Sequence, residues 1–222
     1  MRDFKISSFP NAGLYLLMPD GKRIDLTRKD IDKSTCAILA DQNAIPKNVR
    51  EATAYKPCDI CPERYTAEIC HAIMPVIPFF DDIDRYMSYD KVTAIYRKKE
   101  SDTIIISETN MAEALKFISI LSLIDYCEVG HKYISFFSGI NPMMPPDEIA
   151  KIVFKNIFFE LKGNIEVIQK LVSTMSEEIL HTAKCQVARL NLICNNDSFV
   201  NAFVSTDLIT TFIKLELKEY IA

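Results

Sequence analysis

The residues best suited to chemistry lie between positions 58 and 71. Cys58 and Cys61 are two residues apart, Pro62 follows them, and Cys70 and His71 come next. A turn between two cysteines at this spacing can bring both sulfurs to one metal ion, and a ligand from the following segment extends such a site. The spacing therefore predicts a metal site built on Cys58 and Cys61 together with Cys70 or His71.

Structural zinc takes four soft ligands in a closed tetrahedron, so this site needs a further ligand from elsewhere in the chain. Cys127, His131 four residues later, and the pair His181 and Cys185 are alternative sources. We expect about four of the following residues to bind the metal: Cys58, Cys61, Cys70, His71, Cys127 and His131. Zinc is the expected cofactor if the site is filled, and no other cofactor is indicated. No second C-x2-C motif accompanies the first, so reduced thiols without chemistry remain an open alternative.

The same motif also fits thiol–disulfide exchange. Cys61-Pro62 at the start of a helix would lie near free amides and the positive end of the helix dipole, which favour a thiolate. Cys58 and Cys61 would then be the catalytic pair. The alternating strand and helix pattern expected around such a motif is absent, however.

Composition excludes several other classes of function. The net charge of −4 lacks the basic excess with which proteins neutralise phosphates, so no nucleic-acid partner is expected. The sequence has only 5 glycines and no phosphate-binding motif. Neither nucleotide hydrolysis nor a dehydrogenase activity is therefore expected.

Hydropathy predicts a cytoplasmic protein. No segment reaches the roughly 18 apolar residues of a membrane span, and the first residues lack the apolar core of a signal peptide. The 7 cysteines should then be reduced thiols or metal ligands and not disulfides.

Two hairpins are expected in the first half of the chain. The turn Pro19-Asp20-Gly21-Lys22 joins two short apolar runs within residues 4–27, and a polar link at 98–102 joins residues 92–96 to 103–107. Val92, Ala94 and Tyr96 should share one face of the second hairpin. Residues 36–39 suggest a third short strand.

Helical periodicity covers most of the remainder. Residues 66–86 have helical spacing, but Pro75 and Pro78 should divide them into two helices, one ending near 74 and one beginning near 78. Further helices are predicted over about 110–127, where Thr109 or Asn110 can cap, and over 146–161, 165–194 and 199–219. The helix over 165–194 is either unbroken or split near residue 174.

This pattern predicts an α+β fold, in which two β-hairpins form a small antiparallel sheet packed against a mainly helical C-terminal half. We expect a mixed hairpin and helix part at 1–138, which holds the cysteines, and a helical part at 139–222. The apolar helix over 110–127 should join the two parts into one cooperative unit.

Three short motifs resemble a family of bacterial proteins of unknown function. They are Cys61-Pro62 with the later Cys70, the turn Ser88-Tyr89-Asp90, and the pair Ser122-Leu123. The resemblance covers roughly residues 58–160. It implies a bacterial cytoplasmic protein and draws attention to Cys61, Cys70 and Cys127, but it implies no reaction.

The function favoured by these observations is that of a non-enzymatic protein-binding, assembly or regulatory protein, with a metal held by the cysteine cluster. Its partner would be another protein or a second copy of the chain, because large apolar side chains crowd the last helix beyond one narrow stripe. These side chains are Phe199, Phe203, Leu208, Ile209, Phe212 and Ile213. A thiol–disulfide enzyme and a small-ligand sensor are the alternatives.

Overall fold

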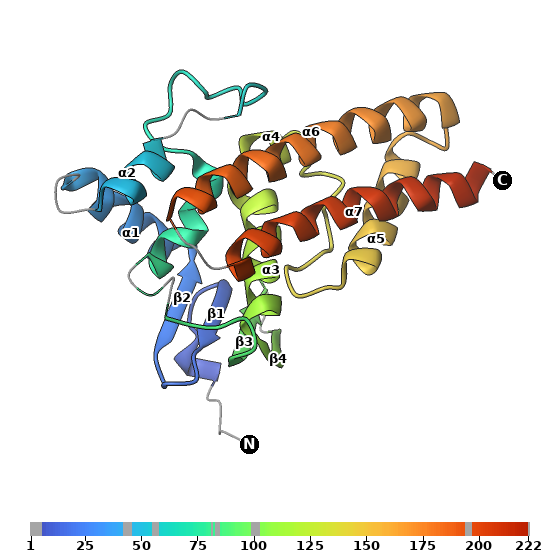
Figure 1. Ribbon diagram of the computed structural model, residues 1–222. Helices are drawn as coiled ribbons and strands as arrows, with labels where there is room; N and C mark the ends of the chain where they lie inside the picture. Colours follow the sequence, from blue (N-terminus) through green and yellow to red (C-terminus); the bar gives the residue numbers. More distant parts are fainter. Residues whose placement is uncertain are drawn as a thin grey trace.

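A four-stranded antiparallel sheet lies at one end of the molecule and helices cover one of its faces (Figure 1). The computed structural model describes residues 6–41, 46–54, 58–80, 82, 85–98, 103–193 and 197–221. For residues 197–207 it describes the backbone only. The strand order is β2-β1-β3-β4. The α+β class and the two joined hairpins are therefore confirmed.

Each hairpin contributes two neighbouring strands. β1 (Gly13–Leu17) pairs with β2 (Arg23–Thr27), and β3 (Lys91–Arg97) pairs with β4 (Ile104–Asn110). The hairpins join where β1 lies antiparallel to β3, with Leu14 opposite Tyr96. Alternate residues of these strands enter the main core, as the period of two requires. The inward residues include Leu14, Leu16, Val92, Ala94 and Tyr96.

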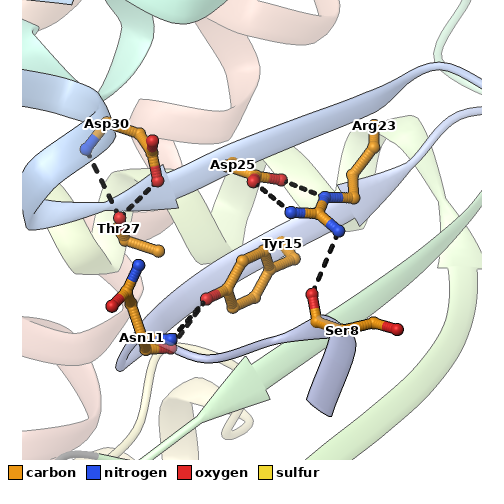
Figure 2. A network of polar contacts seen from close by, with 7 residues as sticks. All are labelled: Ser8, Asn11, Tyr15, Arg23, Asp25, Thr27 and Asp30. Atoms are coloured by element: carbon orange, nitrogen blue, oxygen red, sulfur yellow. Dashed lines mark hydrogen bonds and ion pairs between the residues drawn. The ribbon is translucent and has the colours of Figure 1, made fainter. Parts of the chain in front are cut away.

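The opposite face of β1 carries a small polar and aromatic network (Figure 2). The Tyr15 hydroxyl donates to the Asn11 carbonyl at 2.7 Å, and the Arg23 guanidinium forms a bidentate pair with Asp25. The same guanidinium lies over the rings of Phe9 and Tyr15, at 5.6 and 5.4 Å from their centroids. The N-terminal segment thereby covers a face of the sheet that the helices leave open.

Residues 36–39 do not form a strand. They belong to α1 (Arg28–Ala40), which begins directly after β2. The Thr27 hydroxyl caps this helix by accepting from the Asp30 amide at 3.3 Å, and it also hydrogen bonds the Asp30 side chain. This local cap outweighs the weak strand preference of three apolar residues. α2 (Lys47–Ala54) follows.

The described residues also do not form the two helices expected to end near residue 74 and to begin near residue 78, and residues 81, 83 and 84 of the second lie outside the described residues. A single three-ten helix, η2 (His71–Phe79), runs through both Pro75 and Pro78, and turns occupy residues 59–66. Proline removes one amide donor, which here leaves the Ala72 carbonyl without its three-ten partner. The Ser122 hydroxyl donates to that carbonyl. A side chain from a distant segment thus compensates for the proline.

Ser122→Ala should lower the free energy of unfolding by about 1–3 kcal/mol, because it leaves the buried Ala72 carbonyl without a donor. Urea unfolding would measure the change. The exposed Ser173 on α6 is a suitable control, and Ser173→Ala should have almost no effect. Equal midpoints for the two variants would contradict the role given to Ser122.

The chain turns sharply after the central helix. α3 (Met111–Leu121) is capped by Asn110, whose side chain accepts from the Glu113 amide at 3.0 Å. A π-helical turn, η3 (Ser122–Tyr126), follows it, and then the short helix α4 (Glu128–His131). A Cβ atom at Gly130 would lie 1.9 Å from the Leu123 carbonyl oxygen, so only glycine allows α4 to pack so closely on η3.

Three long helices complete the fold. α5 (Pro146–Glu160), α6 (Ile165–Ile193) and α7 (Asp197–Ile221) pack together, and α7 also lies against α3 (Figure 1). α6 is unbroken at residue 174. Ile118 and Leu121 of α3 belong to the core beneath the sheet, while Ile120 belongs to the core among the long helices. α3 therefore contributes to both cores, although the division at residue 138 and the cooperativity of the chain stay predictions.

Two properties of these helices bear on possible partners. On α7, Ile209 and Ile213 are buried and Leu208 is 47% exposed, while Phe199 and Phe203 lie outside the described side chains. Within the described residues, no helix has the combination of length and apolarity that crossing a membrane requires.

Candidate functional site

Five cysteines surround one cavity of about 20 Å³. They are Cys58, Cys61, Cys70, Cys127 and Cys185. A space of this size holds about one water-sized particle. The cavity therefore has room for a single ion and is too small for an organic cofactor.

Four separate segments supply these thiols. Cys58 and Cys61 lie in a turn after α2, which the Cys61 amide closes by donating to the Cys58 carbonyl at 2.8 Å. Cys70 precedes η2, Cys127 lies between η3 and α4, and Cys185 comes from the middle of α6. Residues far apart in the sequence thus meet at one point.

Cys58 and Cys185 form a hydrogen-bonded pair. This bond and then burial raise the pKa of Cys58, while the same bond lowers the pKa of Cys185. Burial raises the pKa of Cys127 to about 12 and also raises those of Cys61 and Cys70. Without a metal, four of the five thiols are therefore protonated at neutral pH.

Other groups at the cavity favour the thiolate form. The buried guanidinium of Arg189 also lines the cavity. Its charge acts to lower the pKa values of Cys58, Cys70 and Cys185, against burial, which acts to raise all three. Backbone amides act in the same direction at Cys70 and Cys127. Four thiolates on a divalent ion carry a net charge of −2, and a buried cation offsets part of that charge.

The predicted ligands divide between the cavity and its rim. Cys58, Cys61, Cys70, His71 and Cys127 all line the cavity. His131 does not line it, and its Nδ1 lies 3.6 Å from a Glu128 oxygen.

The remaining histidine and cysteines are elsewhere. His181 does not line the cavity, and its Nε2 lies 4.0 Å from an Asp59 oxygen. Of the predicted pair His181 and Cys185, only Cys185 therefore reaches the cavity. Cys36 is exposed on α1, and Cys194 lies outside the described residues.

Sequence reasoning missed Arg189 and the rim carboxylates Glu63 and Glu128. A usable signal was present on α6, where Thr182, Cys185, Gln186 and Arg189 repeat at helical spacing and line the cavity together. When polar residues occupy the buried face of a long helix in place of apolar ones, they indicate a binding or catalytic site on that face. Glu63 and Glu128 carry no comparable signal, because acidic residues next to turns are common.

No protein-family model, curated protein or solved structure matches this chain. The resemblance carried by the short motifs thus stays a prediction.

Proposed function

We propose that this protein is a non-enzymatic binding or assembly protein that holds one zinc ion with thiolates. The observation that carries the proposal is the convergence of five cysteines from four segments on a cavity of single-ion size. Cys58, Cys61, Cys70 and Cys127 supply four sulfurs, and Cys185 supplies a fifth beside Cys58. Zinc suits such a site because it accepts four thiolates in closed geometry and has no redox chemistry of its own.

The ion would stabilise the structure around the cysteine turn. Residues 58–70 contain turns and little regular structure, so few backbone hydrogen bonds hold them in place. A metal bound by the turn, η2 and α4 would restrict this segment in the way that a structural zinc site does.

The turn held in this way displays a pair of residues suited to protein recognition. Tyr65 is 81% exposed, and the Arg64 guanidinium lies 4.3 Å from the centre of its ring. The guanidinium also donates to the Asp59 carbonyl at 2.7 Å. Tyrosine and arginine are enriched among the residues that dominate binding energy at protein interfaces. The metal would thus position a contact surface for a protein partner.

Native mass spectrometry of protein purified without chelator tests the proposal. We expect the mass of one zinc ion per chain, lost in the double variant Cys58→Ser/Cys185→Ser and retained in Cys36→Ser, because Cys36 lies on α1 and does not line the cavity. An apo mass with all thiols open to alkylation would contradict it. The same spectrum reports whether the chain is a dimer.

Thiol–disulfide chemistry is the second candidate, supported by the hydrogen bond between Cys58 and Cys185. The pair would be Cys58 and Cys185 in place of Cys58 and Cys61. Attack by Cys185 on a disulfide substrate, followed by attack from Cys58, would pass two electrons to the substrate and leave a Cys58–Cys185 disulfide. This candidate predicts a metal-free protein in which oxidised glutathione produces that disulfide, as peptide mapping would detect.

A further inference from the structure

Two carboxylates and one imidazole converge at the rim of the thiol cavity. The His71 Nδ1 lies 3.0 Å from a Glu128 oxygen and 3.3 Å from a Glu63 oxygen. The three ligand atoms lie within 4.8 Å of one another. They come from three segments, since Glu63 lies in the cysteine turn, His71 begins η2 and Glu128 begins α4.

Ordinary hydrogen bonding does not account well for this arrangement. One imidazole nitrogen donates a single proton, yet two carboxylates approach the same nitrogen. The carboxylates carry like charges at short distance, and the side chains of Glu63 and Glu128 are only 39% and 25% exposed. Like charges at such separations repel each other, and water screens them incompletely where they are partly buried. A cation among the three atoms would remove this repulsion.

The distances suit a bound divalent ion. Ligands about 2.0–2.2 Å from a metal lie roughly 3 Å apart when they occupy neighbouring coordination positions. The two distances from Nδ1 already have this length, and the carboxylate oxygens lie within 4.8 Å of each other. Their partial exposure leaves room for water to complete the coordination.

The ligand chemistry differs from that of the cavity. Two carboxylates and an imidazole suit manganese or ferrous iron, whereas thiolates select zinc and other soft ions. The His131 Nδ1 lies 3.6 Å from the second oxygen of Glu128, so an imidazole flanks each side of that carboxylate. His131 can thus hold Glu128 in orientation as a partner behind the ligand.

We propose that Glu63, His71 and Glu128 bind a divalent cation of the manganese or ferrous type at the rim of the cavity. This site uses no sulfur ligand and goes beyond the zinc site proposed above.

Titration with Mn²⁺, followed by the electron paramagnetic resonance signal of the free ion, tests the site. The wild-type protein should bind one Mn²⁺ per chain. Glu128→Gln and Glu63→Gln should each weaken binding by at least about tenfold, because each removes a ligand. The two variants alter different segments, so a folding defect in one does not decide the result.

Two controls separate this site from an exposed thiol and from general surface charge. Cys36→Ser, which changes the exposed thiol on α1, should leave Mn²⁺ affinity unchanged, and so should Glu166→Gln, which changes an exposed glutamate in the first turn of α6. Absence of Mn²⁺ binding at millimolar concentration would overturn the proposal, as would undiminished binding in both glutamate variants.

Discussion

We expect Gly130→Ala to destabilise the protein strongly, because the added methyl group overlaps with the backbone of a neighbouring segment. The added Cβ would lie 1.9 Å from the Leu123 carbonyl oxygen and 3.0 Å from its carbon. Both atoms belong to the backbone, so no side-chain rotation relieves the overlap and α4 must move away from η3. We expect a loss of about 3 kcal/mol or more in the free energy of unfolding, measured by urea denaturation.

Gly139→Ala is the matched control. Gly139 has φ of +89° and nothing within 4 Å of an added Cβ, so its replacement costs only the left-handed backbone strain of about 1–2 kcal/mol. If Gly130→Ala were no more destabilising than Gly139→Ala, the close approach of α4 to η3 would be refuted. Displacement of α4 should also disturb the adjacent Cys127.

Zinc affinity should fall steeply as the pH is lowered. The pKa values of Cys58, Cys61 and Cys70 are raised, and that of Cys127 is about 12, so these thiols are protonated at neutral pH in the absence of metal. Each thiol must lose its proton to bind zinc, and acid therefore opposes binding. Each proton displaced contributes about a tenfold change in affinity per pH unit, so the four protonated ligands give about a ten-thousandfold change per pH unit.

Competition with a chromophoric chelator between about pH 6 and 8 would measure this slope, once protonation of the chelator itself is taken into account. Calorimetry in buffers of different ionisation enthalpy would count the released protons independently. A nearly pH-independent zinc affinity would show that the thiols are not the ligands.

The parts of the fold that could be predicted from the sequence have local causes. The turn at Pro19-Asp20-Gly21 specifies the first hairpin, and Asn110 caps α3 through a contact three residues away. The three-ten helix through Pro75 and Pro78 could not be predicted in this way. Its Ala72 carbonyl is satisfied by Ser122, a partner that no local pattern identifies.

In the candidate site too, residues close in the sequence could be predicted and residues from distant segments could not. The spacing of Cys58, Cys61 and Cys70 indicates a shared location, because a turn and a short segment join them. Cys185 was only one of several alternatives for a further ligand, since its approach to Cys58 depends on how α6 packs. Arg189 reaches the thiols by the same packing, and its burial cannot be inferred from an arginine in an amphipathic helix.

The distribution of the cavity residues along the chain has a consequence for synthesis on the ribosome. Cys58, Cys61 and Cys70 are made first, and α6 brings Cys185 and Arg189 to them only after the long segment between residues 70 and 185 has been made. At roughly 5–20 residues per second, the early thiols wait several seconds or more without their buried surroundings. During that interval they are open to oxidation and to the wrong metal ions, so correct loading of the proposed zinc site would depend on the order in which the segments leave the ribosome.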